Sequence, residues 1–191
     1  MLQDAILQSV KVAAGVAAAV MLALAATADV SAARYPVHFP RVTEIASEVA
    51  GRPVDVFCEV QEDWIADPVQ AVAPDAWGYT RFDPRTGEPL YAALEPRTCG
   101  YLLLLIQDPN ERSGLHGREG YYGEARALLS VLHEANHLRG LRSESAAECR
   151  ALSLVPTTAR ALGADRAHVT KLVKLARRVH GMLSPEYQIG C

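Results

Sequence analysis

Residues 124–139 read EARALLSVLHEANHLR and are the most informative stretch of this chain. Their apolar residues recur every three or four positions, at Leu128, Leu129, Val131, Leu132, Ala135 and Leu138. That spacing places them on one face of a helix, whereas a strand would alternate every second residue. No Pro or Gly interrupts the stretch before Gly140, and glycine is common just past a helix end. We therefore predict a helix over residues 124–139.

Two histidines of this helix, His133 and His137, enclose Glu134 in a His-Glu-x-x-His pattern. Four residues make about one turn of helix, so both imidazoles project from the same face and can share one metal ion. The carboxylate between them can reach a water molecule on that metal. The alternative is a charged helix face that carries two incidental histidines.

His133, Glu134 and His137 resemble the motif of the zincin metallopeptidases, and the resemblance covers residues 124 to about 150. It implies that the two histidines bind Zn²⁺ and that Glu134 is the general base. Zinc in such a site needs a third protein ligand and keeps one position open for water. We therefore expect the third ligand among the acidic residues that follow the helix.

Glu144 and Glu148 are the candidates for the third ligand. A second helix predicted from about Ser143 would place both carboxylates on one face, because they too are four positions apart. A tight turn at Gly140 would fold this second helix back onto the first. The two carboxylates would then meet the two imidazoles.

The spacing of Glu144 and Glu148 resembles the E-x-x-x-D pattern of the gluzincins, which are zincins with a glutamate ligand. The resemblance implies that Glu144 binds the metal and that Glu148 accepts a hydrogen bond from a ligand histidine. The two roles could also be exchanged, and Ser145 with Glu148 fits a helix capping box. The chain departs from the gluzincins in its short spacing. It departs from the metzincins because Ser143 stands where their third histidine would be.

The rest of the sequence predicts the domain that carries this motif. The chain has 191 residues, 50% of them hydrophobic, and a net charge of −3. The length favours one main domain, and the lack of a basic excess argues against a nucleic-acid partner. We expect residues 34–191 to form an α+β domain, with a small antiparallel sheet packed on three or four helices. The predicted elements are a helix at 41–50, a strand at 53–60, a hairpin of 76–82 with 90–94, and helices at 99–107, 144–162 (interrupted near Pro156) and 165–183. Loops are predicted at 61–75, where 61–65 could instead be a turn of helix, and at 108–123.

Residues 1–33 carry the apolar run Val12–Ala26. The run is short for a membrane span, which needs about 20 residues, and small residues close it, as in a signal peptide. An uncleaved signal anchor and a buried helix of a cytosolic domain are the alternatives. Either form of export places the domain outside the cytoplasm, secreted or anchored to the cytoplasmic membrane.

The four cysteines, Cys58, Cys99, Cys149 and Cys191, are widely spaced and contain no C-x-x-C pair. An even set with this spacing predicts two disulfides in an oxidising compartment. Of the three possible connectivities we favour Cys58–Cys99 with Cys149–Cys191. Four buried thiols are the alternative.

Together these features predict an exported zinc-dependent peptidase that acts on peptides or proteins. A further donor should stabilise the oxyanion, and Tyr187, Tyr122 and His180 are its candidates. One alternative is a non-catalytic exported metal-binding module that recruits a partner. Another is a structural domain in which the His and Glu side chains hydrogen-bond between two helices.

Overall fold

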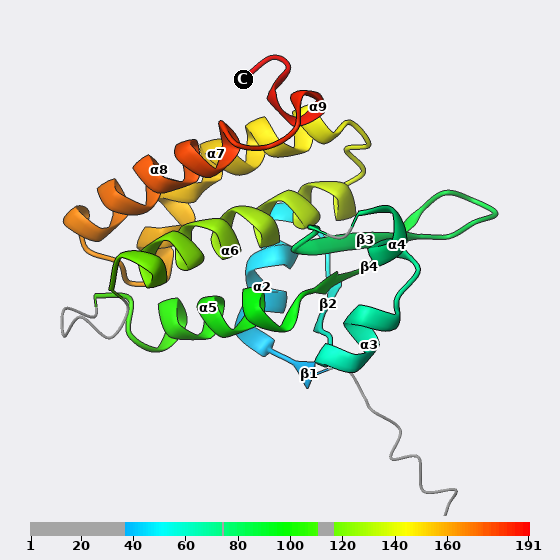
Figure 1. Ribbon diagram of the computed structural model, residues 1–191, viewed down its shortest axis with the longest axis horizontal. Coiled ribbons are helices and arrows are strands. Elements are labelled where there is room, and N and C mark those ends of the chain that lie inside the picture. The colour runs from blue at the N-terminus through cyan, green and yellow to red at the C-terminus, as the bar shows by residue number, and fades with distance from the viewer. Residues whose placement is uncertain (1–36, 74, 111–116) are drawn as a thin grey trace, which may run out of the picture. The chain divides into compact units, whose positions relative to one another are not determined.

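The computed structural model describes residues 37–73, 75–110 and 117–191 (Figure 1). The predicted signal segment, residues 1–33, lies outside these ranges. Across the ranges that are described, none of the helices combines the length and the apolar character needed to cross a membrane.

The described residues form an α+β domain, as predicted, with a small sheet packed on helices. In chain order its elements are β1 (Val37–His38), α2 (Pro40–Ala50), β2 (Asp55–Cys58), α3 (Gln61–Ala66), α4 (Val69–Val72), β3 (Gly78–Phe82), β4 (Pro89–Leu94), α5 (Pro96–Gln107), α6 (Gly117–Leu138), α7 (Glu144–Ala161), α8 (Arg166–His180) and α9 (Pro185–Gln188).

The sheet has the strand order β1-β2-β4-β3 and is mixed rather than purely antiparallel. The predicted hairpin is present, since β3 pairs antiparallel with β4. However, β2 pairs with β4 in parallel. A parallel pair needs a long crossover, and residues 59–88 supply it through α3, α4 and β3. Residues 61–75 were expected to be a loop with a possible helical turn at 61–65, and α3 confirms that turn. The inner strand β4 ends in three fully buried residues, Ala92, Ala93 and Leu94.

Helix α6 lies at the centre of the helical layer, with α5 on one side and α7 and α8 on the other (Figure 1). It also packs on α2 and on strands β3 and β4. The apolar face predicted for it is buried: Leu128, Leu129, Val131, Leu132, Ala135 and Leu138 are all at most 3% exposed. The His-Glu-x-x-His motif therefore lies on a helix that is packed on both helices and strands and is largely buried.

Two helix boundaries differ from the prediction. Helix α6 already begins at Gly117, so the expected loop 108–123 is too long. Gly123 favoured a loop by its own propensity, but a Cβ there would lie 2.3 Å from the ring of Tyr101. The glycine instead allows α5 and α6 to approach closely.

Helix α7 continues through Pro156, because its neighbours Val155 and Ala159 are fully buried and hold the helix in place.

Both predicted disulfides are present, Cys58–Cys99 and Cys149–Cys191. They differ in their surroundings. Cys58 and Cys99 are each 3% exposed and join β2 to α5 in the core. Cys191 is exposed, and its bond to α7 holds the segment that contains α9, a helix with no buried residue. Two disulfides are typical of a protein from an oxidising compartment.

We predict that the two disulfides protect different parts of the molecule. They close loops of nearly equal length, with sequence separations of 41 and 42. Each therefore removes about 4 kcal/mol of chain entropy from the unfolded state. Cys58→Ala with Cys99→Ala should lower the midpoint of denaturant unfolding. Cys149→Ser with Cys191→Ser should instead open residues 184–191 locally, because no buried side chain of α9 holds them.

Hydrogen exchange and denaturant unfolding of the two double variants would check this difference. Unchanged protection of residues 184–191 in the Cys149 and Cys191 variant would contradict it.

Candidate metal centre

The turn between α6 and α7 brings the motif residues together. His133 and His137 lie on α6, and Glu144 is the first residue of α7. Gly140 has a φ of +107°, a conformation that glycine adopts readily and that lets the chain reverse. The hydroxyl of Ser143 accepts a hydrogen bond from the backbone N–H of Ala146 at 3.3 Å. Ser143, rather than Ser145, is therefore the N-cap of the second helix.

Three ligand atoms converge at this turn. The Nε2 atom of His133 lies 3.0 Å from Nε2 of His137 and 3.0 Å from Oε2 of Glu144. The third side of the triangle, from Nε2 of His137 to Oε2 of Glu144, is 3.3 Å. Two imidazoles and a carboxylate at these separations form a group that can hold a metal ion.

The outer nitrogens of the two rings fix their tautomers. Nδ1 of His137 lies 2.6 Å from the carbonyl oxygen of Leu141, which can only accept, so Nδ1 carries the proton. Nδ1 of His133 likewise donates to Oε2 of Glu148 at 3.0 Å. In the neutral rings both Nε2 atoms therefore present lone pairs. With the carboxylate of Glu144, three electron-rich atoms face one point, and this arrangement requires a cation or an added proton.

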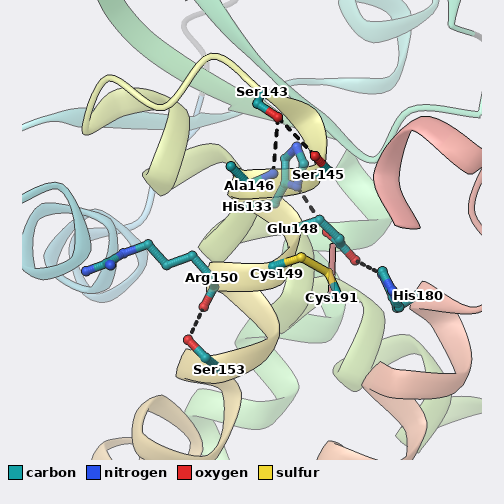
Figure 2. Close-up of a disulfide and its surroundings, with 10 residues drawn as sticks. All are labelled: His133, Ser143, Ser145, Ala146, Glu148, Cys149, Arg150, Ser153, His180 and Cys191. Atoms are coloured by element: carbon teal, nitrogen blue, oxygen red, sulfur yellow. Dashed lines mark hydrogen bonds and ion pairs between the residues drawn. A yellow bond between two sulfur atoms is a disulfide. The ribbon is translucent and has the colours of Figure 1, made fainter. Parts of the chain in front are cut away.

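Glu148 on α7 lies between His133 and His180 (Figure 2). It is 2% exposed, and its second oxygen lies 3.4 Å from Nδ1 of His180. Because its carboxylate meets the outer nitrogen of His133, it lies apart from the three converging atoms. The geometry thus separates the roles that the sequence left open, with Glu144 in the metal group and Glu148 orienting His133. The Cys149–Cys191 disulfide is adjacent to it along α7 (Figure 2).

The ionisation of the group reflects this crowding of acceptors. Burial alone would lower the pKa of His133, but hydrogen bonds with Glu144 and Glu148 raise it to about 10. Burial would also lower the pKa of His137, but its hydrogen bond with Glu144 has the larger combined effect with the nearby charges, and the pKa is raised. The same bonds from the two histidines lower the pKa of Glu144 to about 2. Without a metal, the site therefore holds a proton in its place.

Glu134 is also buried, at 6% exposure, and burial raises the pKa of its carboxyl. The hydroxyl of Thr80 on β3 donates a hydrogen bond to its Oε2 at 2.8 Å. Sequence reasoning missed Thr80, because a contact across 54 positions leaves no local pattern. Gly78 makes this approach possible, since a Cβ there would lie 2.8 Å from Leu94 and 3.1 Å from Glu134.

A cleft of about 500 Å³ opens beside His133 and Glu134. Its walls are residues 73 and 75–78, one face of α6, the end of α8, and α9. Of the three expected oxyanion donors, Tyr187 borders the cleft near the metal group, with its ring centroid 5.7 Å from that of His133. Tyr122 lies further along the cleft against Met182, and His180 lies behind Glu148.

We predict that the metal-free protein loses stability as the pH rises above neutrality. The pKa of His133 is about 10 in the folded state against an ordinary 6.5. Its contribution to the free energy of unfolding is therefore complete below pH 6.5 and is lost as the pH rises through 10. Glu144 acts at the other end: its pKa falls from 4.5 to about 2, so its contribution is lost as the pH falls through that range.

Metal should reverse the alkaline trend, because it binds the deprotonated ligands and its stabilisation grows with pH. Urea unfolding between pH 6 and 9, with chelator and with added Zn²⁺, measures both trends. Parallel curves under the two conditions would show that no metal occupies this group.

A second prediction concerns Glu148. Glu148→Gln should weaken zinc binding about ten- to a hundred-fold, because an amide orients His133 but polarises it less than a carboxylate. Glu144→Gln should weaken binding more, since it removes a ligand. The matched control is Glu124→Gln on α6, which alters another buried Glu–His contact, 3.0 Å from His168. Competition titration with a chelating indicator measures all three. Equal affinities for wild type and Glu148→Gln would refute the orienting role.

Comparison with known proteins gives no family assignment. No protein-family model, curated protein or solved structure matches this chain.

Proposed function

We propose that this protein is a zinc-dependent peptidase that hydrolyses peptide bonds outside the cytoplasm. The observation that carries the proposal is the convergence of three ligand atoms, from His133, His137 and Glu144, beside the buried carboxylate of Glu134. A cleft that can admit a peptide opens at the same place. A purely structural His–Glu cluster would need the hydrogen bonds, but neither the second buried carboxylate of Glu134 nor a cleft beside it.

The donor set fits zinc. Catalytic zinc sites often take two histidines and one glutamate, with the fourth position left to water or substrate. Bonds of about 2.0–2.2 Å arranged tetrahedrally separate the ligand atoms by about 3.3–3.6 Å. The separations here, 3.0 to 3.3 Å, need only a slight expansion. Glu148 faces the far side of His133 and leaves a fourth position free, and the side chain of Glu144 is 42% exposed to solvent.

The residues of the site divide the chemistry of hydrolysis among them. Bound zinc supplies a Lewis acid that lowers the pKa of water towards about 7 and polarises the substrate carbonyl. Glu134 accepts the proton of the attacking water and passes it to the leaving amine. Its raised pKa suits both steps, because a buried carboxyl holds a proton more readily. The hydrogen bond from Thr80 keeps that carboxylate oriented towards the cleft.

Tyr187 is the best placed donor for the oxyanion. Burial and the nearby carboxylates raise the pKa of its hydroxyl to about 12, so it stays protonated and can donate at neutral pH. It borders the cleft from α9, which the Cys149–Cys191 bond ties to α7. The oxidising compartment that these disulfides suggest is consistent with an exported enzyme, secreted or held at the membrane by residues 1–33.

We predict that Glu134→Gln abolishes most of the activity while the metal stays bound. The loss should be at least about a hundred-fold in kcat, because the general base is removed and the three ligands are not. His137→Ala should lose the metal as well as the activity. Glu124→Gln, a buried carboxylate on the same helix away from the cleft, is the control and should change neither.

The measurements are zinc content by elemental analysis and cleavage of a mixed fluorogenic peptide library. Zinc bound by wild type with no cleavage of any library member would favour a non-catalytic metal-binding module. Full activity in Glu134→Gln would remove the proposed mechanism.

A further inference from the structure

The cleft extends from the metal centre along α6 towards the start of that helix. Its floor includes Arg126, which is seven residues before His133 on the same face. Seven residues of helix rise about 10 Å. A second hollow of about 620 Å³ adjoins the first and shares Trp77, Tyr122 and Met182 with it. The two hollows therefore offer a substrate more room than the metal centre alone needs.

Arg126 is a half-buried cation that the carboxylates of Asp75 and Glu95 stabilise only at longer range than an ion pair. Its guanidinium carbon lies 3.1 Å from the ring centroid of Trp77, and it donates to the backbone carbonyl of Asp75 at 3.3 Å. Within the described ranges, no carboxylate lies within 4.0 Å of it. Burial lowers the pKa of Arg126 to about 10, so it remains charged at neutral pH.

Two further guanidiniums border the second hollow, from Arg97 on α5 and Arg178 on α8. Neither has an ion-pair partner in the part of the chain that the structure describes. Glu119 is the acidic residue among the lining side chains of that hollow. At the metal end of the cleft, in contrast, the acids Glu134 and Glu148 line the wall. The far end sets the guanidiniums of Arg97, Arg126 and Arg178 against the carboxylates of Asp75 and Glu119 and is net basic, whereas the metal end is acidic.

We propose that the basic end of the cleft is a subsite for an acidic side chain of the peptide substrate, and that Arg126 recognises it. This inference rests on the proposed peptidase function and names its substrate class. An extended peptide advances about 3.3 Å per residue, so Arg126 corresponds to a position about three residues from the scissile bond. Arg97 and Arg178, near Tyr122, correspond to about five residues.

The surroundings of Arg126 suit this role. The contacts with the Trp77 ring and with the carbonyl of Asp75 restrict the guanidinium of Arg126 before a ligand arrives. A carboxylate would accept hydrogen bonds from two N–H groups of this guanidinium and restore charge balance in a partly desolvated position. Leu129, Val179 and Met182 add apolar surface to the same wall of the cleft. An amide such as Asn would lack the charge that this position requires.

The first test is binding without cleavage, on zinc-loaded Glu134→Gln protein. The probes are capped, fluorescently labelled octapeptides of Ala and Leu that carry one Asp, or one Asn, at each position in turn. At one position Asp should bind about ten-fold more tightly than Asn in low salt, and the ratio should shrink as salt screens the pair. Adding Arg126→Gln should bring that ratio to about one, whereas Arg126→Lys, which keeps the charge and guards against misfolding, should retain part of it.

Matched controls separate this subsite from other charge effects. Arg178→Gln should affect only peptides whose acid lies further from the metal, and Arg177→Gln, which borders neither hollow, should affect none. Equal binding of Asp and Asn at every position overturns the proposal. So does an Asp preference that survives Arg126→Gln but disappears in His137→Ala, since the carboxylate would then be binding the metal.

Cleavage of the same peptides by the wild-type protein distinguishes failure of the subsite from failure of the peptidase function. The expected result is a kcat/KM about ten-fold higher for the Asp peptide than for the Asn peptide, lost in Arg126→Gln. Cleavage without an Asp preference would overturn the subsite and leave the peptidase. Binding that depends on Arg126, with no cleavage of any peptide, would support the subsite and overturn the peptidase.

Discussion

The site depends on one electrostatic constraint: three atoms with lone pairs are held within 3.3 Å of each other at the turn between α6 and α7. Their outward partners create this constraint. The carbonyl of Leu141 and the carboxylate of Glu148 take the Nδ1 protons, so both Nε2 atoms face inward. Such an arrangement is unfavourable unless a positive charge occupies its centre. A proton supplies that charge up to the raised pKa of His133, about 10, and a divalent cation supplies it when the rings are neutral.

The fold maintains this geometry by burying the helix that carries it. Helix α6 contacts four other helices and two strands, so its backbone cannot shift without disturbing the core. Two glycines determine how closely its neighbours approach: Gly123 accepts the ring of Tyr101, and Gly78 brings β3 against Glu134. The wall formed by α9 is held differently, by the Cys149–Cys191 bond rather than by buried side chains. The metal group is thus rigid, whereas the side of the cleft that carries Tyr187 depends on one covalent tie.

Sequence reasoning was accurate where the signal was local. The spacing of apolar residues predicted the helix. The motif and the turn at Gly140 predicted that the two histidines would lie close to Glu144. The cysteine pairing was also correct. Contacts between distant segments left no such pattern, which is why Thr80 and the parallel pairing of β2 with β4 were missed. The start of α6 was misplaced for the opposite reason, because packing on Tyr101 overrode the weak helix propensity of Gly123.

The two ends of the cleft differ in charge, and one ligand can bind at both. The metal end contains Glu134, Glu144 and Glu148 and is complete only with a cation. The other end contains Arg126, on which Asp75 and Glu95 act only at longer range, with no carboxylate within ion-pair distance in the described ranges, so it can bind a further anion. Both demands lie on one face of α6, about 10 Å apart, because seven residues of helix separate them. A peptide with a carbonyl at one end of that span and a carboxylate at the other would satisfy them together, whereas neither a free metal ion nor a neutral peptide would.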